Sequence, residues 1–275
     1  MKETETTSEA VRRLMRSART FQISVDVDSI DRGIAIAEAA LAAGVNLIEM
    51  GTPLLKCGGV YNVVPAFRER FPDTLLLADM KTMDGGAFEA RAVYMGGGNI
   101  IDFLALSGSD TARAVCVVRD EFRDSDPAIP RLAFADILVP QQGPAETAVN
   151  AARRMVDSGV DGVGVHLQLD ARRANGDLLK SDYLFDVACA IHDAVGDAVE
   201  FGVGAENIDL GTQNPMNSPW LVGPAPGNTD DVQILDLRTM ETRLLSEIAG
   251  TALPEHASYL TSSNGPGGTL VIGLQ

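Results

Sequence analysis

Short apolar stretches with strand character recur at regular spacing, and helical patterns fill the intervals between them. Six such stretches begin near residues 21, 45, 74, 99, 131 and 159, so their starts lie roughly 24 to 32 residues apart. The intervals contain patterns such as SIDRGIAIAEAALAAG, PAETAVNAARRMVDSG and SDYLFDVACAIHDAVG. Alternating strands and helices predict a parallel sheet covered by helices. Six units by residue 195 favour an α/β fold, a (β/α)8 TIM barrel, with a doubly wound open sheet as the alternative.

Ionisable side chains occur at the carboxyl ends of several of these strands. In FQISVDVD, strand alternation places Asp26 on a polar face that would look into a barrel, opposite an apolar face that would pack under helices. The same alternation places Glu49, Asp79, Lys81 and His166 on inward faces. Side chains from different strands converge at the carboxyl end of a barrel, where barrel enzymes keep their active sites. The sequence therefore predicts a charged site at this end.

Two interpretations of this charged group remain open. Glu49 and Asp79 offer hard oxygen ligands of the kind that Mg²⁺ prefers, and Lys81 would balance them and stabilise negative charge on a substrate. The other interpretation is a structural network of ion pairs at strand ends. His166 is either a general acid/base near neutral pH or a hydrogen-bonded structural residue. Asp136 also ends a strand, and either supports the site or caps the strand.

The chain is strongly acidic, which limits the partners that it can attract. Its 275 residues contain 22 Lys plus Arg against 38 Asp plus Glu, for a formal net charge of -16. This charge argues against nucleic acid and anionic membranes as partners, and an anionic substrate would need a local Lys, backbone amides or a bound cation. The three cysteines include no CxxC pair, and no apolar run approaches the roughly 18 residues of a membrane span. We expect a soluble, cytoplasmic protein with reduced thiols.

The regular alternation of strands and helices has limits at both ends of the chain. An amphipathic helix is expected from about residue 8 to 18, so 1–20 is assigned as an N-terminal helix and 21–275 as a single barrel. Within the barrel, 205–268 is rich in Gly, Pro and Asn and is expected to be an irregular insertion of unknown role. It contains one helical pattern, TMETRLLSEIAG. The final GGTLVIGLQ is expected to be the last barrel strand.

The stretch ADMKTMDGG resembles the Asp-x-Lys-x-x-Asp signature on the third strand of the orotidine 5′-monophosphate decarboxylase superfamily. The resemblance extends to SVDV, IEMGTPLLK and GVDGVGVHLQLDARRANG in the expected order, and covers about residues 20 to 200. With Glu49, the stretch IEMGTP resembles the metal-dependent branch of this superfamily. That branch contains 3-hexulose-6-phosphate synthase and 3-keto-L-gulonate-6-phosphate decarboxylase. KTMDGG and GTPLLK look more similar to the synthase.

This resemblance implies a role for each matching residue. Glu49 and Asp79 would hold Mg²⁺, which chelates the oxygens of the cis-enediolate that this branch shares as an intermediate. Lys81 and Asp26 would contact substrate hydroxyls and the developing oxyanion. His166 would move protons to or from the intermediate.

The resemblance also implies a dimer and a phosphate site. Asp84 matches a carboxylate that crosses a dimer interface into the partner's site, so each active site of a homodimer would need two chains. Family members bind the substrate phosphate with backbone amides after strands seven and eight. Gly202, Gly204 and Gly273 are the candidates here, with Asp170 as a further substrate-binding candidate. The connection before Gly273 is much longer than in the family, and no Arg follows that glycine.

The leading hypothesis is therefore a Mg²⁺-dependent carbon–carbon lyase that adds formaldehyde to ribulose 5-phosphate through an enediolate. One alternative is a decarboxylase of a 3-keto sugar acid phosphate or of a related non-phosphorylated substrate. An alternative of another class is a non-catalytic barrel that binds a ligand or partner. Residues 205–268 are interpreted as a lid or dimer arm, as a reshaped substrate site, or as a scrambled C-terminus.

Overall fold

The computed structural model describes residues 7–17, 22–42, 45, 47–140, 143–175, 183–196, 200–204, 220–225, 228–236, 241–244, 247, 259–265 and 269–274. Its main body is a seven-stranded sheet in which the strands follow one another in chain order, each parallel to the next. The strands are β1 (Gln22–Val25), β2 (Leu47–Met50), β3 (Leu75–Thr82), β4 (Ile100–Leu104), β5 (Leu132–Val139), β6 (Gly162–Leu167) and β7 (Glu200–Gly204). Sequential order is that of a (β/α) barrel, whereas a doubly wound sheet reverses its order at a switch point. The expected α/β barrel architecture is confirmed.

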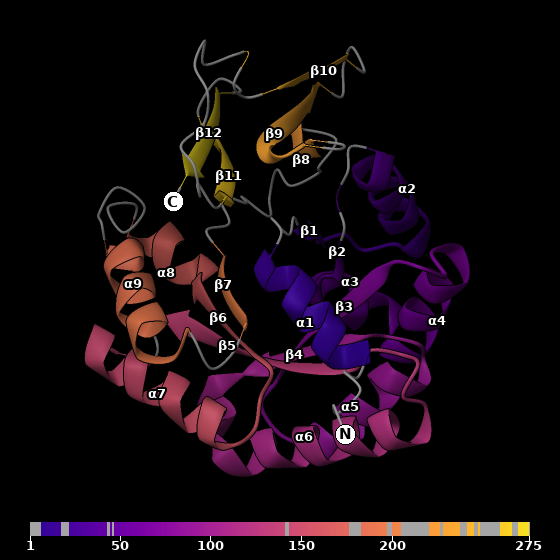
Figure 1. Cartoon of the computed structure of the whole chain (residues 1–275), viewed down its shortest axis with the longest axis vertical. Coiled ribbons are helices and arrows are strands. Elements are labelled where there is room, and N and C mark those ends of the chain that lie inside the picture. The colour runs from indigo at the N-terminus through magenta and orange to yellow at the C-terminus, as the bar shows by residue number, and fades with distance from the viewer. Residues whose placement is uncertain are drawn as a thin grey trace, which may run out of the picture.

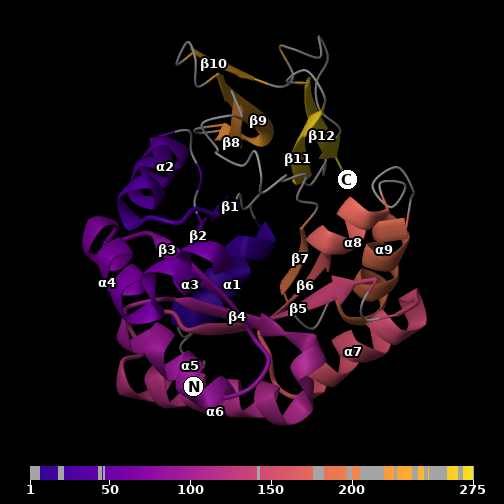
Figure 2. The same cartoon turned by 180° about the vertical axis from the view of Figure 1, so that it is seen from behind.

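Helices follow the strands and cover the outer side of the curved sheet (Figures 1 and 2). They are α2 (Ile30–Ala42), α3 (Thr52–Gly58), α4 (Val60–Arg70), α5 (Gly86–Met95), α6 (Gly108–Ser125), α7 (Ala145–Asp157), α8 (Leu169–Ala174) and α9 (Tyr183–Val195), with a 3-10 turn, η1, at Ala105–Ser107. The expected N-terminal helix is present as α1 (Thr7–Ser17). Along the parts of the chain that the structure describes, no helix is both long and apolar enough to cross a membrane.

The two faces of the sheet bury different apolar residues, as strand alternation predicts. Leu47, Leu77, Ile100 and Leu132 pack together inside the barrel, with Val11 of α1 against them. The intervening residues of the same strands pack outward in a much larger core under the helices. The inner cluster lies toward the amino ends of its strands, so the inward positions that follow it on β2 and β3 are left for polar side chains. Those positions carry the candidate site.

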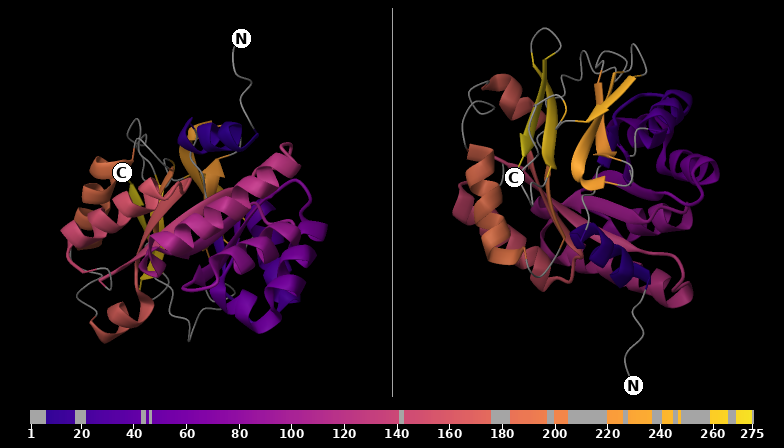
Figure 3. Two further views of the ribbon diagram at one scale, coloured as in Figure 1. Left: turned by 90° about the horizontal axis from the view of Figure 1, so that it is seen from below. Right: turned by 45° about the horizontal axis from the view of Figure 1, so that its top comes forward.

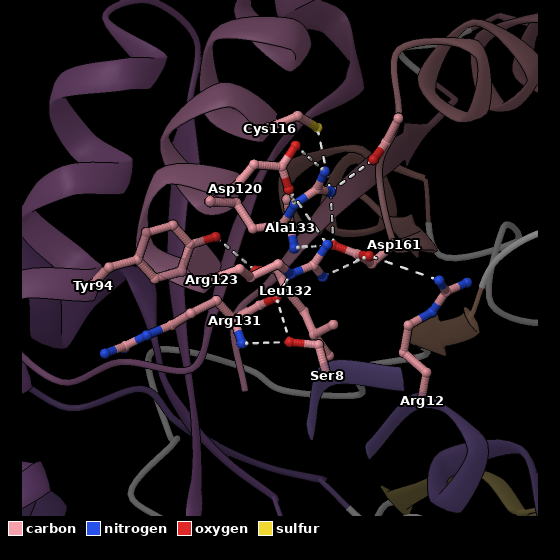
Figure 4. A network of polar contacts seen from close by, with 12 residues as sticks. Ser8, Arg12, Tyr94, Cys116, Asp120, Arg123, Arg131, Leu132, Ala133 and Asp161 are labelled. Carbon is pink, nitrogen blue, oxygen red and sulfur yellow. Dashed lines mark hydrogen bonds and ion pairs between the residues drawn. The ribbon is translucent and has the colours of Figure 1, made fainter. Parts of the chain in front are cut away.

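An ion-pair network, drawn in Figure 4, joins α1 and α6 to the amino ends of β5 and β6. Asp161 is buried and accepts hydrogen bonds from Arg119 Nη1 and Arg123 Nη2, both at 2.8 Å, and from the Ala133 N–H at 2.9 Å. Arg12 of α1 lies 3.8 Å from the same carboxylate. Because barrel enzymes keep their chemistry at the carboxyl ends of the strands and use the amino ends for stability, we assign the network a structural role.

Beyond β7, the described segments form antiparallel strands that gather at one end of the molecule (Figures 1 and 3). One sheet has the order β10-β9-β8, from β8 (Trp220–Ala225), β9 (Asn228–Asp236) and β10 (Glu241–Leu244). A separate pair is formed by β11 (Tyr259–Gly265) and β12 (Thr269–Leu274), and β11 contacts β7.

Two expectations for this region are wrong. The helix expected in TMETRLLSEIAG is replaced at Glu241–Leu244 by a strand, because pairing with β9 overrides local helical preference. The segment Thr269–Leu274 is a strand as expected, but it pairs antiparallel with β11 and does not add an eighth parallel strand to the barrel sheet. The short NGPGG connection favours a hairpin with the neighbouring segment, since closing a short loop costs little entropy. The division of the chain into an N-terminal helix, a barrel and an insertion stays a prediction.

Candidate active site

The end of β3 departs from regular strand geometry. Its register with β4 pairs Asp79 with Asp102 and then Thr82 with Phe103, so that two residues of β3 are extra. One of them, Lys81, has a φ of 46°, in the left-handed region that residues other than glycine rarely adopt. Bulges of this kind redirect a side chain at a strand end, and strained backbone of this kind gathers at functional sites.

Lys81 is the centre of the polar cluster. Its Nζ donates to Asp79 Oδ1 at 2.9 Å and to Asp136 Oδ2 at 3.1 Å, and both carboxylates are buried. Burial lowers the pKa of Lys81, but the nearby Asp136, Asp79, Asp102 and Glu49 carboxylates outweigh burial and raise it above its ordinary value. Lys81 therefore carries a fixed positive charge in this site.

Glu49, on the neighbouring strand β2, is held from β1. Gln22 Nε2 donates to Glu49 Oε2, and the Ser24 hydroxyl lies 3.1 Å from Glu49 Oε1. The same hydroxyl lies 3.0 Å from Asp26 Oδ2, so its single proton is given to one carboxylate at a time. Neutral donors that orient a carboxylate in this way are the usual surroundings of a metal-ligating group.

Asp26 follows β1 and depends on Gly51, the residue between β2 and α3. A Cβ on Gly51 would lie 2.0 Å from Asp26 Oδ1, so only glycine leaves room for this carboxylate. Burial, and then the charge of Asp79, raise the pKa of Asp26 to about 6, although Ser24 and Lys81 act in the opposite direction. Asp26 thus lies against the cluster.

Thr52, the first residue of α3, is a contact that sequence reasoning missed. Its Oγ1 lies 2.6 Å from Asp79 Oδ2 and 2.9 Å from the Asp79 carbonyl oxygen, and it has one proton to donate. With Lys81 on Oδ1 and Thr52 on Oδ2, both oxygens of Asp79 are oriented. The position of Thr52 in IEMGTP, two residues after the strand that carries Glu49, is the signal in the sequence that could have identified it.

His166 reaches the cluster through Asp136. Its Nδ1 lies 3.9 Å from Asp136 Oδ2, and its side chain is 14% exposed. In the sheet, His166 pairs with Leu138 on one side and with Gly204 of β7 on the other. The structure therefore places Asp136 and His166 in the same group as Lys81.

The remaining predicted residues lie outside this group. Asp84 is exposed on the loop after β3, where its Oδ1 accepts the next backbone N–H at 2.7 Å. Asp170 is exposed in the first turn of α8. Gly202 and Gly204 lie in β7 beside β6, whereas Gly273 lies in the β11–β12 pair. Their roles in substrate or phosphate binding stay predictions.

Asp102 of β4 is a second residue that sequence reasoning missed. It pairs in register with Asp79, and its Oδ1 is buried with no hydrogen-bond partner among the residues that the structure describes. Burial, followed by the charges of Asp136 and Asp79, raises the pKa of Asp102 well above its ordinary value. The signal in the sequence is a single Asp within the apolar run NIIDFLAL, on the face shared with Ile100.

Acidic charge exceeds basic charge in this cluster. Five carboxylates influence one another or Lys81, and they are Asp26, Glu49, Asp79, Asp102 and Asp136. In the described part of the chain, no three Cys, His, Asp or Glu side chains come together as a ready-made metal site. Mg²⁺, however, commonly takes only one or two protein carboxylates and keeps several waters. Glu49 and Asp79 fit that requirement, and the excess negative charge favours a cation.

The parallel strands follow chain order, and acidic and basic side chains gather at their carboxyl ends. These two features are typical of (β/α) barrel proteins, which build their sites at that end. The chain belongs to the orotidine 5′-phosphate decarboxylase / HUMPS family, whose sequence profile matches residues 19–184. The resemblance inferred from ADMKTMDGG is confirmed.

Two curated relatives are similar over part of the chain. A 3-hexulose-6-phosphate synthase of Methylomonas aminofaciens is 28% identical over 153 residues, which is 56% of this chain and 66% of the relative. A 3-hexulose-6-phosphate synthase of Mycobacterium gastri is 33% identical over 91 residues, which is 33% of this chain and 43% of the relative. The chain thus matches less than two thirds of the length of each.

Solved structures share the fold. A 3-keto-L-gulonate-6-phosphate decarboxylase from Vibrio cholerae has a TM-score of 0.55 at 24% identity, covering 68% of this chain and 78% of the other. A 3-hexulose-6-phosphate synthase from Salmonella typhimurium has a TM-score of 0.54 at 21% identity, with the same coverage. At these identities, the likeness extends to the barrel architecture alone.

Proposed function

We propose that the protein is a Mg²⁺-dependent carbon–carbon lyase that acts on a ketose phosphate through an enediolate, with aldol addition of formaldehyde to ribulose 5-phosphate as its reaction. The observation that carries the proposal is the placement of the Lys81 ammonium between Asp79 and Asp136 in a cluster with excess negative charge. The curated relatives described above, both 3-hexulose-6-phosphate synthases, support the choice of reaction.

Glu49 and Asp79 would hold the cation, whose chemistry is Lewis-acid polarisation of the substrate oxygens. Side chains of the protein would carry out the proton transfer and stabilise the negative charge that forms. His166 takes the proton from C1 of the ketose phosphate, and Lys81 stabilises the negative oxygen that forms. Asp26 accepts a hydrogen bond from a substrate hydroxyl. C1 of the enediolate attacks the formaldehyde carbon, so a carbon–carbon bond forms, the C2 carbonyl is restored and the C=O π bond of formaldehyde opens to an alkoxide. This alkoxide takes up the proton that His166 removed from C1.

In this scheme, Asp136 contacts both the Lys81 ammonium and the His166 imidazole. It accepts a hydrogen bond from Lys81, and it lies 3.9 Å from the ring nitrogen of His166. A carboxylate in this place stabilises the imidazolium that forms when His166 takes a proton. Its role is to hold and charge-balance the two groups that touch the substrate.

The proposal is tested by proton exchange. The protein is incubated with Mg²⁺ and ribulose 5-phosphate in D₂O, and loss of the C1 proton signal is followed by NMR. We expect exchange that stops with EDTA and falls at least about 100-fold in Glu49→Gln and Asp79→Asn. The exposed Glu69→Gln and Asp110→Asn variants are matched controls and keep the wild-type rate.

Three outcomes would change the assignment. No exchange together with no Mg²⁺ binding by calorimetry would favour a non-catalytic, ligand-binding barrel. CO₂ release from 3-keto-L-gulonate 6-phosphate, without hexulose phosphate formation from formaldehyde, would favour the decarboxylase, which passes through the same kind of enediolate. Equal binding of ribulose and its 5-phosphate would favour a non-phosphorylated substrate.

We further propose that the protein works as a homodimer in which Asp84 enters the partner's site. Asp84 is exposed on its own chain, and the apolar side chains of Met83 and Phe88, which lie close to it in the sequence, are 53% and 67% exposed. Exposed apolar groups around a polar residue are typical of interaction surfaces. Mixing Lys81→Ala and Asp84→Ala chains should restore part of the exchange activity, because one site of each mixed dimer is then complete. A monomer in sedimentation would contradict this.

A further inference from the structure

Three successive strands place one carboxylate each around the same ammonium. Asp79 is on β3, Asp102 on β4 and Asp136 on β5, and Lys81 itself is on β3. Lys81 bonds to Asp79 and Asp136. Because β4 lies between β3 and β5 in the sheet, the ammonium reaches across the strand that carries Asp102.

Asp102 is the member of this group whose hydrogen bonding is incomplete. Its Oδ1 is buried and unpartnered within the described structure, while the charge of Lys81 acts on it. Buried polar atoms in native proteins almost always have partners, so an unpartnered one calls for an explanation. A lysine ammonium has three N–H donors, and the two bonds described for Lys81 leave one further direction.

The present partner of Lys81 creates a conflict with the proposed metal site. Lys81 donates to Oδ1 of Asp79, and Thr52 contacts Oδ2 of the same carboxylate. A divalent cation on Asp79 would repel an ammonium bonded to the same carboxylate, and this repulsion is strong where water is excluded. The Lys81 bond to Asp136 is not affected in the same way, because Asp136 lies two strands from Asp79.

We propose that Asp102 is a positioning residue for Lys81: when a divalent cation engages Asp79, Asp102 Oδ1 accepts the hydrogen bond that Asp79 loses. Lys81 is then held by Asp102 and Asp136, beside the cation and aimed at the reacting oxygens. The inference rests on the proposed function, because it requires a cation on Asp79. It gives the unpartnered oxygen a role and keeps the two positive charges of the site on separate carboxylates.

A crystal structure of the full chain grown with Mg²⁺ tests the geometry directly. The expected result is Lys81 Nζ within about 3.2 Å of Asp102 Oδ1 and no longer bonded to Asp79 Oδ1. A structure with Mg²⁺ on Asp79 and Lys81 still bonded to Asp79 would overturn the inference and leave the proposed function standing. A wild-type chain that binds no Mg²⁺ in calorimetry would overturn both.

Calorimetry with Mg²⁺ alone separates a hydrogen-bonding role from simple charge. Asp102→Asn removes the charge but keeps a carbonyl oxygen for Lys81, whereas Asp102→Leu removes both. We expect the Kd for Mg²⁺ to rise in both variants, and to be about 10-fold higher in Asp102→Leu than in Asp102→Asn. Equal Kd values would mean that Asp102 acts through charge alone and would overturn the inference. The exposed Asp110→Leu is the control, and thermal melts identify a variant that fails to fold.

Discussion

The Lys81 ammonium lies 3.1 Å from Asp136 Oδ2, although the two residues are 55 positions apart and belong to β3 and β5. This contact fixes the ammonium over the interior of the barrel. We therefore predict that Asp136→Asn lowers the pKa of Lys81 and slows C1 proton exchange at least about 10-fold, because Lys81 loses a charged hydrogen-bond acceptor. The exchange assay in D₂O measures the rate, with the exposed Asp157→Asn as control. An unchanged rate would show that the bond to Asp136 is not needed to hold Lys81 in the working site.

Gly51 is predicted to be indispensable because of its neighbour rather than its backbone. Its φ of -65° and ψ of 157° suit any residue, but a Cβ would lie 2.0 Å from Asp26 Oδ1. Gly51→Ala should displace Asp26 and reduce exchange by about 100-fold, the usual effect of a 1 Å misplacement in an active site. Thermal melts supply the control. An Asp26→Ala background removes the contact with the carboxylate but leaves the approach of the new Cβ to the Val25 carbonyl oxygen, at 2.9 Å. Gly51→Ala should therefore lower Tm less in the Asp26→Ala background than in the wild type.

Asp26 should make stability depend on pH in the absence of metal. Its pKa is about 6 in the folded protein and 3.8 in the unfolded reference, so the folded state holds a proton that the unfolded state has lost between these values. Stability therefore falls as pH rises through this window, and the full cost is present above pH 6. In EDTA, Asp26→Asn should raise Tm at pH 7.5 and have little effect near pH 4. The exposed Asp28→Asn should change Tm equally little at both pH values.

Asp161 should matter for stability and not for the chemistry of the site. It accepts bonds from two arginines and a backbone N–H at the amino end of the barrel. Asp161→Ala leaves the buried Arg119 and the half-buried Arg123 without this carboxylate, so we predict a loss of about 3 to 5 kcal/mol in the free energy of unfolding. Urea denaturation measures it. Asp120→Ala removes a partner of the same Arg119 whose own side chain is 54% exposed, and it should cost about 1 kcal/mol or less. A larger loss in Asp120→Ala would contradict this ranking.

Strand alternation predicted the inward face of the barrel because side chains on a strand point alternately to its two sides. It placed Glu49, Asp79 and Lys81 on the inward face, and the structure brings them together with Asp136 and His166. Strand alternation did not predict the bulge at Lys81. A bulge depends on the register between β3 and β4, and a single sequence does not show that register.

The residues that were missed share a physical cause. Asp102 lies inside an apolar run, where one polar residue is outweighed by its neighbours, and Thr52 is an ordinary helix-start residue by type. The strand β10 escaped notice because its partner strand, and not its own composition, determines its conformation. Contacts between distant segments decided each of these cases.

The network around Asp161 separates two uses of charge within one barrel. At the amino ends of the strands, Asp161 is matched by several arginines, and these pairs hold α1 and α6 in place. At the carboxyl ends, carboxylates crowd around Lys81 and are left unbalanced. A designer who grafts a new binding site onto this scaffold could therefore substitute residues of the cluster around Lys81 and keep the network around Asp161 unchanged. The two groups do not share a residue.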